Sequence, residues 1–131
     1  MTSMNKKIKR NIFWILVLII LAGVVVLIAR SVSAPGKYDQ FAQCLEEKGA
    51  KFYGAFWCPH CQNQKKMFGK SQKYLPYVEC STPNGQGQKE LCNDAGIEGY
   101  PTWVFADESR LSGEVPLATL AEKTMCALPI E

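Results

Sequence analysis

The sequence is poor in histidine, and His60 is the only one in 131 residues. A structural zinc site needs four Cys or His ligands, so cysteines would have to supply it. Cys58 and Cys61 form one close pair, but the further pair, Cys80 and Cys92, is loosely spaced. Attachment of a c-type haem needs a histidine directly after the second cysteine of a close pair, and that position holds a glutamine. We therefore expect neither a metal site nor a haem.

Excess positive charge is also missing from most of the chain, and the sequence contains no internal repeat. The formal net charge is +3, but five of the fifteen Lys and Arg residues flank an N-terminal apolar run, and all twelve acids follow it. The rest of the chain carries ten basic and twelve acidic side chains, a net charge of −2. A basic patch is the electrostatic mark of nucleic-acid binding, so we expect no nucleic-acid partner.

An uncharged apolar run occupies residues 12–29, after four basic residues between positions 6 and 10 and before Arg30. A helix of that length spans about 27 Å, close to the hydrocarbon thickness of a bilayer. A cleaved signal peptide is the competing interpretation, but its apolar core is shorter, roughly 7–15 residues. Basic residues stay on the cytoplasmic side of a membrane helix. We predict a cytoplasmic tail at 1–10, a transmembrane anchor at 11–30, a linker at 31–36 and an outward-facing domain at 37–131.

The outer domain alternates helical and strand patterns. Apolar residues at helical spacing mark 38–45, and an aromatic-rich apolar run predicts a buried strand at 50–56. The later elements expected are a helix at 58–69, a strand at 75–80, a short helix at 89–95, a hairpin from 102–106 and 110–114, and a last helix from Pro116 to about 124. This order predicts an α/β fold, with a mixed sheet of about four strands and helices on both faces, preceded by one transmembrane helix. It resembles the thioredoxin fold without its first strand.

Cys58 falls where the strand at 50–56 gives way to a helix. The unpaired N–H groups of a helix N-terminus favour negative charge, and a thiolate is the nucleophile of thiol–disulfide exchange. Cys61 lies on the same helix face, one turn deeper, so we expect an exposed attacking Cys58 and a sheltered resolving Cys61. Pro59 suits the first helical turn, and His60 offers the Cys58 thiolate a cation or a hydrogen-bond donor. A purely structural disulfide here would close too small a loop to stabilise much. The lysines of this helix are expected to form a solvated face: Lys65, Lys66 and Lys70.

The segment GYPTW at 99–103 supports the redox interpretation. Pro101 stands at a strand start, where the corresponding proline of a thioredoxin fold is cis and packs against the redox pair. A cis X–Pro bond costs only about 0.5–1 kcal/mol, and the alternative is an ordinary trans proline. Tyr100 is expected to flank a peptide-docking groove, and Trp57 either to contact substrate or to pack. Trp103 is expected in the core.

These residues resemble a thioredoxin-family thiol–disulfide oxidoreductase over positions 37 to about 123. CPHC is similar to the DsbA-type active site, and the closer likeness is to the thioredoxin-like domain fused to bacterial homologues of vitamin K epoxide reductase. The strings that carry the resemblance are FAQCLEEKGAKFYGAFWCPHCQNQKKMFGKS, YVEC, GIEGYPTW and LSGEVPLATLAE. In those fusions the membrane part oxidises the thioredoxin-like part and passes the electrons to quinone. With one anchor and no quinone-reducing bundle in this chain, the resemblance implies a separate membrane oxidase as a partner.

One position departs from the family pattern. Thioredoxin and DsbA carry a buried acid six residues before the first active-site cysteine, and here that position holds Phe52. The proton acceptor assumed for the resolving cysteine of thioredoxin is therefore missing. Its absence weakens a thioredoxin-like reductase interpretation.

The other four cysteines are candidates for structural disulfides, because an even number of cysteines in an exported domain favours pairing. Cys80 and Cys92 flank a loop with Gly and Pro, and the related fused domain has a matching pair. On the entropic model, closing that loop raises the free energy of unfolding by roughly 3 kcal/mol. The alternative is that this pair acts as a second redox relay. Cys44 and Cys126 either clamp the ends of the domain together, pair with another chain, or stay free.

Together these features predict a membrane-anchored extracytoplasmic oxidoreductase with a redox-active Cys58–Cys61 disulfide and no other cofactor. We expect it to oxidise cysteines of exported proteins and to be reoxidised by a quinone-coupled membrane protein similar to vitamin K epoxide reductase. Two alternatives stay open. One is a thiol reductase or isomerase of the cytochrome-maturation type, and the other is a non-catalytic, disulfide-stapled binding domain.

Overall fold

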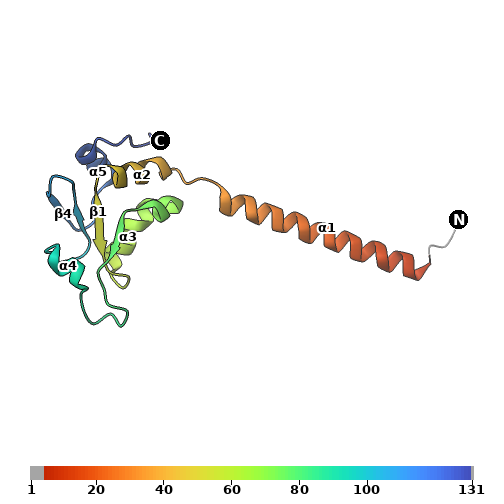
Figure 1. The fold of residues 1–131 in the computed structure, drawn as a ribbon. Coiled ribbons are helices and arrows are strands. Elements are labelled where there is room, and N and C mark those ends of the chain that lie inside the picture. The colour runs from red at the N-terminus through yellow and green to blue at the C-terminus, as the bar shows by residue number, and fades with distance from the viewer. Residues whose placement is uncertain (1–4, 131) are drawn as a thin grey trace. The chain divides into compact units, whose positions relative to one another are not determined.

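The N-terminal helix is the longest element of the protein, whose computed structural model describes residues 5–130 (Figure 1). Helix α1 (Lys6–Ser33) begins after Asn5, whose side chain accepts a hydrogen bond from the Lys7 amide at 3.3 Å. None of the residues of α1 is buried. Its length and apolar composition are sufficient to cross a membrane.

The chain divides into two units between Ala34 and Pro35. Helix α1 is longer than the expected anchor at 11–30, and it includes the first three residues of the expected linker. The helix ends only where Pro35 disfavours a helical conformation for the residue before it, and Ala34 is accordingly extended (φ −62°, ψ 132°). Residues 1–4 of the expected tail and residue 131 of the expected domain lie outside the described residues.

The second unit contains a four-stranded mixed sheet in the order β2-β1-β3-β4. Its strands are β1 (Lys51–Gly54), β2 (Tyr77–Glu79), β3 (Thr102–Val104) and β4 (Arg110–Ser112). Strand β1 pairs in parallel with β2 and antiparallel with β3, and β3 pairs antiparallel with β4. In this register Phe52 lies between Tyr77 and Trp103. The predicted mixed sheet is confirmed, and its strand β1 leads directly to the cysteine pair.

The helices of this unit follow the predicted order with one addition. They are α2 (Asp39–Glu47), α3 (Pro59–Met67), α4 (Glu90–Asp94) and α5 (Leu117–Thr124), with a 3₁₀ helix, η1 (Gly69–Tyr74), after α3. The helix expected at 58–69 stops at Met67 because Gly69 has a positive φ of 54°, which ends a regular α-helix. The chain then continues as η1, which the sequence pattern does not predict.

Side chains alternate along β1 between two buried clusters, one on each face of the sheet. Phe52 faces the larger cluster, where its ring stacks on Trp103 at 4.8 Å between centroids and meets Tyr77 edge-on at 5.3 Å. Tyr53 faces the smaller cluster together with the Cys80–Cys92 disulfide. Trp103 is fully buried, so its predicted core position is confirmed.

Two disulfides hold the domain together. Cys80–Cys92 connects the end of β2 to α4, with a Cα–Cα distance of 5.7 Å. Cys44–Cys126 connects α2 to the segment after α5, with a Cα–Cα distance of 5.9 Å. The structure thus pairs these four cysteines within one chain, and Cys58 and Cys61 are free thiols.

The two disulfides are expected to contribute unequally to stability. Replacing Cys44 and Cys126 together by serine opens a loop with a sequence separation of 82 and removes about 4–5 kcal/mol from the free energy of unfolding on the entropic model. The same change at Cys80 and Cys92, with a separation of 12, removes about 3 kcal/mol. Urea unfolding of the full chain in detergent, followed by tryptophan fluorescence, measures both losses. Equal or reversed losses would contradict the loop-length explanation.

Candidate active site

The cysteine pair lies at the junction of β1 and α3. After β1 ends at Gly54, a turn leads to Cys58, which is the N-cap residue of α3 and has an extended backbone (φ −77°, ψ 118°). Pro59 occupies the first turn of α3, where its missing N–H loses no helical hydrogen bond. The Gln62 amide donates to the Cys58 carbonyl at 3.2 Å. The first turn of α3 therefore places Cys58 at the helix N-terminus, with Cys61 one turn further along.

Both thiols are covered by protein. Cys58 is 5% exposed and Cys61 is 0% exposed. The Cys58 thiol donates to the Tyr100 carbonyl at 3.7 Å, and the Tyr100–Pro101 peptide bond is cis. The expectation of an exposed Cys58 is therefore wrong, because the loop before β3 lies against its sulfur. Cys61 remains the more sheltered of the two.

Cys61 is packed against the end of β1. Burial, together with a hydrogen bond to Cys58, raises the pKa of Cys61 to about 12. A Cβ on Gly54 would lie 2.9 Å from the Cys61 sulfur and 2.9 Å from the Tyr77 ring. The backbone of β1 and the Tyr77 ring thus form two walls of the Cys61 pocket, and the strand has no room for a side chain where it passes the thiol.

Phe52 occupies the position at which the resemblance places an acid in related proteins. Its side chain is fully buried and stacks on Trp103. An aromatic ring accepts no proton, so this residue of β1 cannot take one from Cys61. A group that compensates for the charge of a Cys61 thiolate therefore has to be a residue other than Phe52.

Three aromatic residues border the cysteine pair. Phe56 and Trp57 are about half exposed, and the Trp57 ring lies edge-on to that of Tyr100 at 6.0 Å between centroids. The Trp57 indole N–H donates to the Ser81 hydroxyl at 2.9 Å, and the Tyr100 hydroxyl donates to Gln88. Trp57 therefore packs on one side and presents an exposed aromatic surface on the other, and contact with substrate stays a prediction.

His60 contacts an acid rather than the Cys58 sulfur. Its Nδ1 lies 2.7 Å from Glu114 Oε1, and the Asn63 side-chain amide donates to the same oxygen at 3.1 Å. These two hydrogen bonds lower the pKa of Glu114. The His60 side chain is 68% exposed. The expected contact of His60 with the thiolate is replaced by a surface contact, because the fold brings the segment after β4 next to α3.

Two polar residues of α3 have positions that the helix pattern does not predict. Gln64 is fully buried, donates to the Val115 carbonyl at 3.0 Å and accepts from the Val115 amide at 2.6 Å. Lys65, expected on a solvated face, is half-buried, with its Nζ 3.4 Å from the centroid of the Tyr77 ring. The signal that could have found both residues is their spacing of three and four from the buried Cys61, which places them on its face of the helix.

The chemistry open to this site is that of its two free thiols. Within residues 5–130, no group of three or more His, Cys, Asp or Glu side chains is placed to hold a metal ion. Two thiols on one helical turn can form a disulfide with each other or with a thiol of another protein. The geometry therefore supports thiol–disulfide exchange.

The fold and the dithiol together define a class of protein. A cysteine pair at a helix N-terminus, beside a cis proline that leads into a mixed sheet, is the arrangement of a thioredoxin-like domain. Residues 37–125 match the family model described as Thioredoxin. The match covers more than half of the chain, which therefore belongs to the thioredoxin family.

Two relatives agree with this assignment. Over 88 residues the chain is 56% identical to "Thiol-disulfide oxidoreductase LTO1" of Arabidopsis thaliana, a match covering 63% of the chain and 23% of the relative. Over 75 residues it is 35% identical to "Thioredoxin domain-containing protein 5 homolog" of Drosophila melanogaster, covering 49% of the chain and 17% of the relative. The chain spans less than a quarter of the length of these curated relatives. The family and the first relative support the expected enzyme class, a protein disulfide oxidoreductase.

Replacing Gly54 by alanine is expected to disturb the Cys61 pocket. The new Cβ would lie 2.9 Å from both the Cys61 sulfur and the Tyr77 ring, so one of these walls has to move, at a cost of about 1–3 kcal/mol in the free energy of unfolding. Gly99→Ala is the matched control, because nothing lies within 4 Å of its Cβ position. Denaturant unfolding measures both variants. Equal stability of the two would show that the pocket is less tightly packed than the structure indicates.

Proposed function

We propose that the protein is a membrane-anchored thiol–disulfide oxidoreductase whose thioredoxin-like domain faces away from the cytoplasm. The observation that carries this proposal is the state of the six cysteines. Four are joined in two disulfides, and Cys58 and Cys61 are free at the N-terminus of α3. Structural disulfides persist outside the cytoplasm. The length and composition of α1 support the anchor, and the basic residues between 6 and 10 support the orientation.

The proposed reaction is the oxidation of cysteine pairs in exported proteins. A client thiolate attacks Cys58 of the Cys58–Cys61 disulfide; the bond between these two breaks, and Cys61 keeps the electron pair and later takes a proton. The second client thiolate then attacks the client sulfur bonded to Cys58, so the client disulfide forms and Cys58 leaves as a thiolate. The two electrons of the client now reside in the Cys58–Cys61 dithiol, which needs an external oxidant.

Two features of the site support the oxidising direction. The CPHC sequence resembles the DsbA-type site, whose family gains oxidising power because its reduced form is stabilised. Phe52 also stands where the resemblance places the acid that accepts the proton of the resolving cysteine in thioredoxin. A site without that acceptor is less suited to the reductive cycle of thioredoxin.

The oxidant is proposed to be a separate quinone-coupled membrane protein similar to vitamin K epoxide reductase. The support is the resemblance of several strings around the site to the thioredoxin-like domain of such fusions. An anchor followed by a short connection would keep Cys58 near the membrane surface, because only residues 34–36 of the expected linker lie outside α1, and three extended residues reach roughly 10 Å. That reach suits a partner embedded in the same membrane.

In cells, the Cys58–Cys61 pair is expected to be mainly a disulfide between reactions, because an oxidase reacts with reduced clients only in its disulfide form. Acid quenching of intact cells, alkylation of free thiols and mass spectrometry of the peptides measure this state. The Cys44–Cys126 disulfide is the internal control and should be oxidised in the same sample. A pair that rests reduced would contradict the oxidising direction and favour a reductase or isomerase. Full cellular activity of Cys58→Ser would instead favour a non-catalytic binding domain.

The Cys61→Ser variant is expected to accumulate mixed disulfides through Cys58, because the resolving thiol is gone. Non-reducing gels and mass spectrometry should find exported proteins and a quinone-linked membrane protein among the trapped partners. The double variant Cys58→Ser, Cys61→Ser is the control and should trap neither. Recovery of soluble clients without a membrane oxidase would count against the proposed partner.

A further inference from the structure

The mechanism requires the buried Cys61 sulfur to carry a negative charge. In each step that makes or breaks the Cys58–Cys61 bond, Cys61 attacks or leaves as a thiolate. Burial opposes that charge and raises the pKa of Cys61 to about 12. Phe52, in the place of the acid in related proteins, offers neither a charge nor a proton acceptor. A compensating cation near the sulfur would make both steps easier.

Lys65 is a cation on the same face of α3 as Cys61, four residues further along. Its Nζ lies 3.4 Å from the centroid of the Tyr77 ring, within the range of a cation–π contact. The same ring lies near the Cys61 sulfur: a Cβ on Gly54 would be 2.9 Å from each of them, so the two are at most twice that distance apart. The ammonium of Lys65 is thus held against the ring that forms one wall of the Cys61 pocket.

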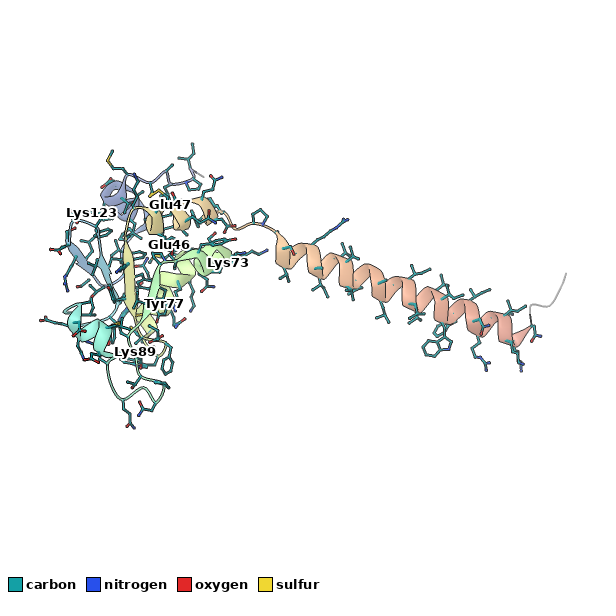
Figure 2. The ribbon with its side chains drawn as sticks, in the orientation of Figure 1. Glu46, Glu47, Lys73, Tyr77, Lys89 and Lys123 are labelled. Atoms are coloured by element: carbon teal, nitrogen blue, oxygen red, sulfur yellow. A yellow bond between two sulfur atoms is a disulfide. The ribbon has the colours of Figure 1, made fainter. Side chains whose placement is uncertain are left out.

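Glu79 holds the Tyr77 ring in this position. The Tyr77 hydroxyl donates to Glu79 Oε2 at 2.7 Å. Glu79 Oε1 accepts from the Phe56 amide at 3.2 Å and from the Ser81 amide at 2.9 Å. Three donors therefore fix one carboxylate, and the carboxylate fixes the ring on which Lys65 rests. Tyr77 lies on strand β2, close to the centre of the domain in the view of Figure 2.

The charged groups around the Cys61 pocket change one another's pKa. Burial lowers the pKa of Lys65, and Glu79 opposes that fall by favouring the ammonium. A backbone hydrogen bond with Ala55 opposes the rise in the pKa of Cys61, and the charge of Lys65 opposes it further. The neighbouring Lys66 is exposed to solvent. The titratable groups that face the pocket come from α3, β2 and the loop before β3: Cys58, Cys61, Lys65, Tyr77, Glu79 and Tyr100.

We propose that Lys65 stabilises the thiolate of Cys61 and so supplies a charge that Phe52 cannot provide. This inference rests on the proposed function. When a client thiolate attacks Cys58, the electron pair of the broken bond stays on Cys61 beside the Lys65 ammonium until water supplies a proton. When the dithiol is reoxidised, the Cys58 thiolate attacks a disulfide of the oxidant, whose S–S bond breaks and releases one sulfur as a thiolate, and the Cys61 thiolate then attacks Cys58. The Cys58–Cys61 bond forms and the oxidant's other sulfur leaves with the electron pair.

Conversion of a Cys58 mixed disulfide into the Cys58–Cys61 disulfide tests the inference. The reduced full chain in detergent is mixed with oxidised glutathione between pH 5 and pH 9, quenched with acid at timed intervals and measured by mass spectrometry. Lys65→Met keeps the hydrocarbon stem but removes the charge. It is expected to move the pH–rate profile about one unit higher and to slow conversion at pH 7 roughly tenfold.

Three further variants control the measurement. Lys65→Gln should show the same shift as Lys65→Met, whereas Lys65→Arg, which keeps the charge, should restore most of the wild-type profile. Lys66→Met removes a neighbouring exposed charge and should leave the profile unchanged.

A Lys65→Met profile that coincides with that of Lys66→Met would overturn the inference. It would also be overturned if Lys65→Arg slowed conversion as much as Lys65→Met does, because loss of rate with the charge retained marks a structural role. A wild-type chain that forms no Cys58–Cys61 disulfide would overturn the proposed function, and the inference with it.

Discussion

The constraint on which the site depends is the burial of one thiol, that of Cys61, where β1 meets α3. A neutral thiol is tolerated in an apolar interior, but its thiolate is not unless neighbouring groups compensate. Gly54 leaves room for the sulfur, and the ring of Tyr77 closes one side. On the outer side the Tyr100 carbonyl accepts a hydrogen bond from the sulfur of Cys58. Packing therefore separates a deep thiol from one that lies just beneath the surface.

Disulfide bonding and the site are connected through β2. This strand is three residues long and lies at the edge of the sheet, where it pairs with β1. Short edge strands gain little stability from their own hydrogen bonds. The Cys80–Cys92 disulfide begins directly after β2 and fastens it to α4. Because Tyr77 and Glu79 belong to β2, this covalent link also steadies the wall of the Cys61 pocket.

The features that depend on nearby residues could be predicted from the sequence. Apolar runs and turn residues indicate the helices and strands, and CPHC followed by GYPTW indicates the cysteine pair and its proline. The contacts of individual polar side chains could not be predicted, because their partners are distant in the chain. His60 meets a residue 54 positions away, and Gln64 meets one 51 positions away. The spacing of Lys65 from Cys61 places both residues on one face of α3, but it contains no information about the neighbouring ring of Tyr77.

The stack of Phe52 on Trp103 has a consequence for the linkage between folding and proton binding. A buried acid in the middle of a sheet binds protons differently in the folded and unfolded states, so it makes stability depend on pH. Neither the phenyl ring of Phe52 nor the indole of Trp103 gains or loses a proton by titration. The proton changes that accompany thiol chemistry in this domain are thus confined to titratable groups around the stack, and the stack itself adds no pH dependence to the free energy of unfolding.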